Sequence, residues 1–220
     1  MAGTEKKRVG VESVDHERHV FRSLQVQSIV AEALQFFNET PVYSLPPPGR
    51  FPGAGVYALY YIGRYRLYAK IADLNRENST CPIYVGKAVP KGWRAARIQD
   101  PTGPVLHHRL QEHARSIDQV TNLQRDDFRC RFMILSGLES DLVGTVEAAL
   151  IRRYRPLWNT VIDGFGNHDP GAGRYNQARS EWDILHPGRP WAERLTGQSP
   201  RREDVIEKIR QFLMTLPSPS

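Results

Sequence analysis

Arg109 and His113 are the residues of this sequence that most directly suggest chemistry. They lie four positions apart in Val105–Ile117, whose apolar residues Leu106, Leu110, Ala114 and Ile117 recur at helical spacing. Side chains four apart project from the same side of a helix. A guanidinium can bind anionic oxygens and an imidazole can transfer protons. The pair therefore indicates phosphate chemistry, and the simpler alternative is a basic surface face.

Glu147 is the acidic residue that could complement this pair. It lies in Leu142–Arg155, which predicts a second helix rich in apolar residues. A carboxylate near an apolar face is costly unless it is paired or binds a metal ion. Mg²⁺ is commonly held by one or two carboxylates together with water and substrate phosphate. The alternatives are therefore a Mg²⁺ ligand and a salt bridge to a neighbour such as Arg152.

Two short tyrosine motifs and one asparagine complete the candidates. Gly55-Val56-Tyr57 begins one predicted strand, and Tyr84-Val85-Gly86-Lys87 ends another. Asn159 follows Pro156, where the chain leaves the second helix. Each feature alone has a structural explanation, because tyrosines favour strands and asparagines favour turns. An asparagine at this position could also orient a water molecule or a phosphate.

The spacing of apolar and turn residues predicts an α+β scaffold, a small mixed or antiparallel sheet flanked by helices. Gly55–Ile62 and Arg66–Ala72 form the expected hairpin, and Pro82–Val85 and Phe128–Leu135 are further strands. Outer helices are expected over Val20–Asn38 and Glu203–Leu213. We divide the chain into an arm, helix and Pro-rich linker (1–50), a core with insertions (51–162) and a loop-rich extension packed on the core (163–220).

Composition limits the possible partners and locations. With 30 Lys and Arg against 24 Asp and Glu, the net charge is +6, which favours a polyanion such as nucleic acid. Apolar runs are too short to span a bilayer, and Met1–Asp15 is polar, unlike a signal peptide. The two cysteines form no disulfide framework, and the sequence has no P-loop. A cytoplasmic protein without a nucleotide cofactor is expected.

The combination and order of these motifs resemble the GIY-YIG nuclease family. The motifs are Gly-Val-Tyr, Tyr-Val-Gly-Lys, Arg-x-x-x-His, Glu147 and Asn159. The resemblance spans about residues 55 to 160. Gly164-Phe165-Gly166-Asn167-His168 and Trp182–Arg189 resemble the tail of its type II restriction endonuclease branch, whose members cut GC-rich palindromes in double-stranded DNA. The connection of 26 residues between Tyr57 and Tyr84 is longer than is usual in the family.

The resemblance implies a role for each motif residue. Glu147 would hold Mg²⁺, and Arg109 would neutralise charge on the phosphoryl oxygens. Tyr57 and Tyr84 would position or deprotonate the attacking water, with His113 relaying the proton and Lys87 as a nearby cation. Asn159 would hold the phosphate backbone or the tyrosine geometry. The identity of the general base stays open, because a free tyrosine has a pKa of about 10.

Tyr61-Ile62-Gly63 also spells the second motif of the family literally, but only three residues separate Tyr57 from Tyr61. So short a gap cannot reverse the chain and bring two tyrosines side by side on neighbouring strands. We therefore assign the second motif to Tyr84.

These observations predict a Mg²⁺-dependent type II restriction endonuclease of a bacterial restriction–modification system. Base-reading candidates are the side chains Arg174, Asn176, Gln177 and Arg179. A homodimer is expected because two antiparallel strands must be cut. Its interface could use Asp73–Thr80, Ala88–Pro104, or the first helix with Phe21, Leu24 and Leu34. The alternatives are a repair or mobile-element nuclease and a DNA-binding protein on an inactive scaffold.

Overall fold

The computed structural model describes residues 14–93 and 103–217. Within these residues, four strands form one antiparallel sheet in the order β1-β4-β2-β3. The strands are β1 Val42–Ser44, β2 Gly55–Tyr61, β3 Tyr84–Ala88 and β4 Phe128–Ile134. The expected α+β class is confirmed.

Strand β2 lies inside the sheet, and all seven of its residues are buried. Its sequence Gly-Val-Tyr-Ala-Leu-Tyr-Tyr therefore shows no alternation of polar and apolar residues. Tyr57 lies opposite Gly86 of β3 and Phe132 of β4. This register places the first motif tyrosine beside the glycine of the second motif.

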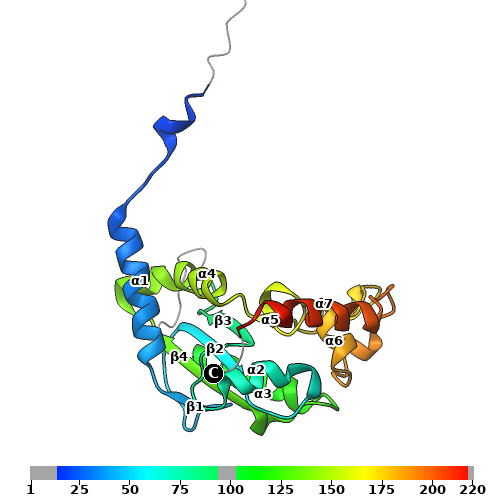
Figure 1. Cartoon of the computed structure of the whole chain (residues 1–220). Coiled ribbons are helices and arrows are strands. Elements are labelled where there is room, and N and C mark those ends of the chain that lie inside the picture. The colour runs from blue at the N-terminus through cyan, green and yellow to red at the C-terminus, as the bar shows by residue number, and fades with distance from the viewer. Residues whose placement is uncertain (1–13, 94–102, 218–220) are drawn as a thin grey trace, which may run out of the picture.

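Helices cover both faces of the sheet (Figure 1). On one face, α1 (Leu24–Glu39) and α4 (Val143–Tyr154) pack on Val56, Ala58 and Tyr60. The other face carries Tyr57, Leu59 and Tyr61 and is covered by the remaining α-helices. These are α2 Ala69–Asn75, α3 Val105–Asp118, α5 Leu157–Thr160, α6 Glu181–Leu185 and α7 Arg202–Thr215.

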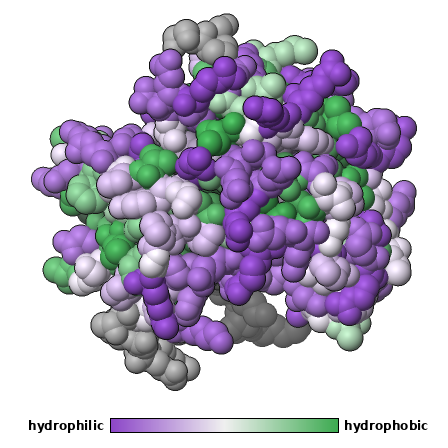
Figure 2. Space-filling view, turned by 90° about the horizontal axis from the view of Figure 1, so that it is seen from below, coloured by the Kyte–Doolittle hydropathy of each residue, from purple (hydrophilic) through white to green (hydrophobic). Residues whose placement is uncertain are grey.

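Short 3-10 helices lie between these elements. They are η1 His16–His19, η2 Arg66–Tyr68, η4 Arg125–Asp127, η5 Gly137–Leu142, η6 Ala172–Arg174 and η7 Ala192–Arg194. The face seen in Figure 2 is mostly hydrophilic, with apolar residues in small separate patches. Most large apolar side chains are accordingly gathered in the two cores on either side of the sheet.

The prediction of a hairpin was wrong, because its expected second strand does not form. Arg66–Ala72 forms η2 and the start of α2 instead, and β2 pairs with β3 and β4. The buried residues Tyr68, Ile71, Ala72 and Asn75 recur at helical spacing, which explains why this segment packs as a helix.

Two strand boundaries also differ from expectation. The strand predicted to stop before Gly86 continues to Ala88, so Lys87 is part of β3. The segment taken as a Pro-rich linker contains the short strand β1, which pairs with β4. The tail contributes Phe165, Trp182 and Ile209 to the same core as Tyr57. The arm before residue 14 lies outside the described residues.

Candidate active site

Tyr57 and Tyr84 lie on neighbouring strands, with their ring centroids 6.2 Å apart. Gly86 leaves room for Tyr57, because a Cβ at this glycine would lie 2.4 Å from the Tyr57 hydroxyl and 3.1 Å from a Tyr84 ring carbon. The glycine of the second motif therefore permits the close approach of the two rings.

Replacement of Gly86 by Ala is expected to displace the Tyr57 hydroxyl and to lower cleavage at least about tenfold, since a small misplacement at a reacting centre is costly. Gly144→Ala is the matched control, because a Cβ at that helical position meets no atom within 4 Å. It should keep full activity and gain about 0.5–1 kcal/mol of stability. Cleavage rates and thermal melts of both variants check this. Equal activity of the two variants would contradict the steric argument.

His113 is the hydrogen-bonding partner of Tyr57, with 2.5 Å between the Tyr57 hydroxyl and Nε2. Helix α3 positions this imidazole, which is 1% exposed and stacks on Phe165 with centroids 4.6 Å apart. Burial lowers the pKa of His113 well below its ordinary value, and the charges of Arg109, His168 and Arg189 lower it further. The resting imidazole is therefore neutral.

The two tyrosines are also neutral at rest. Burial raises the pKa of Tyr57 well above 10, and Tyr84 adds to this effect while Arg109 opposes it. Burial also raises the pKa of Tyr84, which Arg109 lowers and Glu147 raises. A water-activating role for either phenol accordingly requires that its proton passes to an acceptor, and His113 is in contact with Tyr57.

Arg109 lies one turn before His113 on α3, as the spacing predicts. Its guanidinium donates to Gly166 O at 3.1 Å and to a Glu112 carboxylate oxygen at 2.9 Å. It also contacts His168 Nε2 at 2.6 Å. Arg109 and His113 line one cavity with Gly166 and His168. The guanidinium is therefore placed at the wall of a cavity that an anion could enter.

His168 is a site residue that the sequence reasoning did not single out. It lies in the exposed segment after Phe165 and reaches Arg109 from across the cavity. The Gly-Phe-Gly-Asn-His string was visible as a tail motif, but nothing in its spacing predicts a contact with a residue 59 positions earlier.

Glu147 and Lys87 form an ion pair that joins α4 to β3. Glu147 therefore pairs with Lys87 rather than with Arg152. Lys87 is 27% and Glu147 19% exposed at the side chain, so both are accessible to solvent. The negative charge of Glu147 contributes to the raised pKa values of Tyr57 and Tyr84 after burial. Glu147 thus belongs to the same electrostatic site as the tyrosines, although it comes from the other face of the sheet.

The donor set can be tested against the expected Mg²⁺. No group of three His, Cys, Asp or Glu in residues 14–93 and 103–217 could hold a metal ion. A single accessible carboxylate, Glu147, suits an ion that keeps several waters and shares the substrate phosphate. The residues fit Mg²⁺ in this way, and they do not form a closed metal cage.

Asn159 holds the outer edge of β3. Its side chain accepts from Val85 N and donates to Val85 O, both at 2.8 Å, and Trp158 N donates to Ile83 O at 2.9 Å. Both ends of the amide are therefore engaged with the strand that carries Tyr84. In this position Asn159 fixes the strand that carries Tyr84, and its amide is not free to contact a phosphate.

Tyr61 lies in the core and not in the site. Its ring packs against Tyr68 and Phe128, and its hydroxyl accepts from Tyr65 N at 2.7 Å. Burial raises the pKa of Tyr61 to about 12. Tyr61 thus lies on the same strand as Tyr57, and Tyr84 lies on the neighbouring strand.

The family is shown by comparison with known proteins. A family model described as the Eco29kI GIY-YIG domain matches residues 49–213, three quarters of the chain. The chain belongs to this GIY-YIG nuclease family. A search of curated proteins finds no match. The match includes every candidate residue from Tyr57 to Asn159 and continues through most of α7, so the tail is part of the family domain.

The candidate base-reading residues of this GIY-YIG protein lie near the site. Arg174 and Gln177 line a cavity with Asn167 and His168, and His168 also lines the Arg109 cavity. Arg179 is engaged differently, because it pairs with the carboxylate of Glu193 at 2.9 Å. Asn176 is exposed. Arg174 and Gln177 are therefore the two that line a cavity next to that of Arg109 and His113.

No helix within the described residues is long and apolar enough to cross a membrane.

Proposed function

We propose that this chain is a Mg²⁺-dependent type II restriction endonuclease that hydrolyses double-stranded DNA at a specific, GC-rich palindromic site. The observation that supports the proposal is that the Tyr57–His113 pair lies beside Arg109, with the charge of Glu147 close enough to raise the pKa values of Tyr57 and Tyr84. The proposal also places the protein in the cytoplasm, as part of a restriction–modification system. These two points rest on the reduced cysteines and on the restriction-type family.

The reaction is an attack of water on the scissile phosphorus. A P–O bond to the water oxygen forms, the P–O3′ bond breaks, and the leaving O3′ takes up a proton from solvent. Tyr57 can accept the water proton while its own proton passes to Nε2 of the neutral His113. Arg109 neutralises the charge that grows on the phosphoryl oxygens.

Glu147 is the residue that would hold Mg²⁺, and a bound Mg²⁺ would supply positive charge to stabilise the phosphate and the leaving oxygen. Lys87, which pairs with Glu147 in the structure, is the nearest cation that could balance the charge of a phosphate or of a tyrosinate. Tyr84, next to Tyr57 and within the field of Arg109, holds the water from the other side.

The test is digestion of DNA of known sequence with Mg²⁺ and with EDTA, followed by mapping of the ends. Cuts at one sequence that require Mg²⁺ support the proposal. Cleavage at structural features rather than at a sequence would indicate the repair or mobile-element alternative. Specific binding without cleavage in any divalent ion would indicate an inactive DNA-binding scaffold.

The proposal includes a homodimer whose interface contains α1. Figure 1 shows the first half of α1 extending beyond the sheet. Phe21 and Leu24 are 85% and 79% exposed, and Leu138 of η5 is 88% exposed. Ile29 and Phe36 line an apolar cavity with Leu138. A second copy is the proposed occupant, since a two-fold axis through this patch would bury the same apolar residues on both chains.

Other expected interface residues are placed differently. Leu34 packs inward against the α4 core. Asp73–Thr80 supplies polar residues to a cavity shared with Arg129 and Arg131. Much of Ala88–Pro104 lies outside the described residues.

The double variant Ile29→Asp with Leu138→Asp is expected to be monomeric and to accumulate nicked plasmid, because two charges would enter the apolar interface. Sedimentation and plasmid assays measure both effects. Asp substitutions at the exposed positions Gln35 and Thr215 provide the control. A wild-type protein that stays monomeric on cognate DNA would exclude the dimer.

A further inference from the structure

Arg189 of the tail binds the backbone of the loop that contacts the catalytic residues. Its guanidinium donates to three carbonyl oxygens of this loop: Gly164 O at 2.9 Å, Phe165 O at 3.1 Å and Asn167 O at 3.3 Å. The carbonyl of Gly166, which lies between them, accepts from Arg109. Arg189 and Arg109 thus bind different carbonyls of the same loop. We refer to Gly164–His168 as the catalytic loop.

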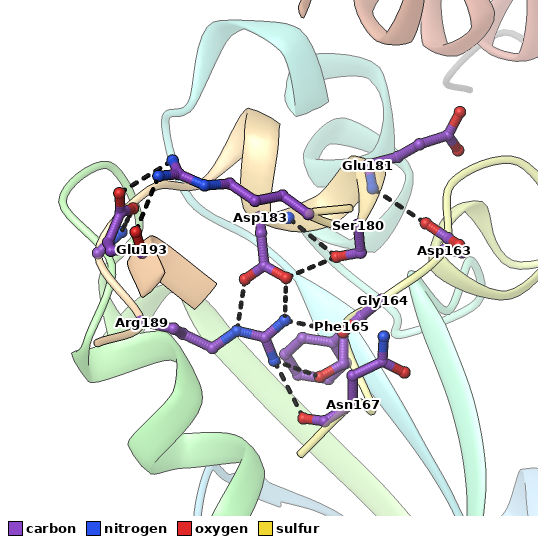
Figure 3. Close-up of polar contacts among 11 residues, drawn as sticks. Asp163, Gly164, Phe165, Asn167, Ser180, Glu181, Asp183, Arg189 and Glu193 are labelled. Carbon is purple, nitrogen blue, oxygen red and sulfur yellow. Dashed lines mark hydrogen bonds and ion pairs between the residues drawn. The ribbon is translucent and has the colours of Figure 1, made fainter. Parts of the chain in front are cut away.

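Arg189 is itself fixed in place (Figure 3). Asp183 binds its Nε and Nη2 at 2.7 Å each, and the two side chains are 1% and 2% exposed. The guanidinium carbon lies 4.6 Å from the ring centroids of both Trp182 and Trp191. Ser180 donates to the second Asp183 oxygen at 2.6 Å. A planar fork between two rings can hold only one orientation.

The catalytic loop connects Arg189 to the candidate site through direct contacts. Phe165 stacks on His113 and meets the edge of Tyr84, with centroids 5.0 Å apart. A Cβ at Gly166 would lie 2.8 Å from the Tyr84 hydroxyl. His168 contacts Arg109. The loop therefore contacts Arg189 through its backbone and three residues of the proposed reaction, His113, Tyr84 and Arg109, on its other side.

We propose that the Arg189–Asp183 pair positions the catalytic loop, and through it Arg109, His113 and Tyr84, for phosphodiester hydrolysis. The inference rests on the proposed function, and it assigns to the tail a part in catalysis in addition to DNA recognition. The competing explanation is a pair that only helps the tail to fold. A buried ion pair of that kind contributes little net stability when it is compared with apolar packing.

The test compares Arg189→Lys and Asp183→Asn with the wild-type chain. Lysine keeps the charge but cannot bind a carboxylate and three carbonyls from one plane. We expect both variants to fold and to bind cognate duplex with Kd within about threefold of wild type. Their single-turnover cleavage should fall about 10²-fold, as misplaced catalytic groups do. The imidazole NMR signals of His113 and His168 should shift.

Lys70→Met is the matched control. Lys70 also donates to two backbone carbonyls, Leu213 O at 2.9 Å and Leu216 O at 2.8 Å, but it holds the end of α7 and not the catalytic loop. This variant should change the melting temperature without changing the cleavage rate of the folded protein or the two imidazole signals.

Folded Arg189→Lys with wild-type imidazole signals and a rate within about threefold of wild type would overturn the positioning role. Should Arg189→Lys not fold, Phe165→Leu decides in its place, because it keeps an apolar side chain and removes the ring on His113. An unshifted His113 signal and full activity in that variant would overturn the inference. A wild-type chain that cuts no DNA would refute the proposed function, while the imidazole signals would still report on the positioning.

Discussion

Glu147→Gln is expected to abolish cleavage and to leave folding and duplex binding intact. Glutamine keeps the shape and an acceptor oxygen for Lys87 but removes the charge that would hold Mg²⁺. The cost in stability should not exceed about 1 kcal/mol, because the pair is partly exposed. Removal of a negative charge near the DNA backbone should not weaken binding, and at low salt it should strengthen it.

Cleavage assays with Mg²⁺ and gel-shift titrations of the same duplex measure the two effects separately. Glu139→Gln is the control, since Glu139 is an exposed residue of η5. It removes the same charge without affecting the site. Loss of binding together with cleavage in Glu147→Gln would show that Glu147 is structural.

Arg109→Ala is expected to lower the single-turnover cleavage rate about 10²–10³-fold, the usual cost of removing a positioned donor to transition-state charge. Duplex affinity should fall far less, because one cation is lost from a larger phosphate-binding surface. Because Arg109 also binds Gly166 O and His168, part of the loss would come from the loop.

Arg109→Lys separates these two contributions, since lysine restores the charge without the fork. Arg76→Ala removes an exposed guanidinium that pairs with Asp73, and it serves as the charge-matched control. A change below about tenfold in Arg109→Ala would remove this residue from the catalytic site.

The parts of the site that local spacing determines were predictable from the sequence. Arg109 and His113 share a helical face because Leu106 and Leu110 fix the buried side of α3. Tyr57 and Tyr84 were assigned to neighbouring strands because the alternative Tyr61 was too close in sequence. The α+β class followed from the same patterns together with the family resemblance.

The parts that depend on long-range packing were not predictable. The alternation of Arg66–Ala72 after the turn signal at Gly63-Arg64 predicts a strand, whereas tertiary packing buries Tyr68 and Ile71 on one side of a helical segment. The sequence predicts Lys87 as a cation near the tyrosines, but its pairing with Glu147 depends on how α4 packs against β3. His168 contacts Arg109 from a loop that also binds Arg189, and these three residues are far apart in the sequence.

The contacts of Asn159 and Trp158 have a consequence for how copies of this protein meet. An edge strand with unpaired backbone groups is a template on which another chain can add a strand and begin to aggregate. At the outer edge of β3, the Asn159 amide binds both Val85 N and Val85 O, and just before the strand Trp158 N donates to Ile83 O, so an added strand cannot use these groups. An added strand would therefore meet an edge whose Val85 groups are already bound by a residue of the same chain.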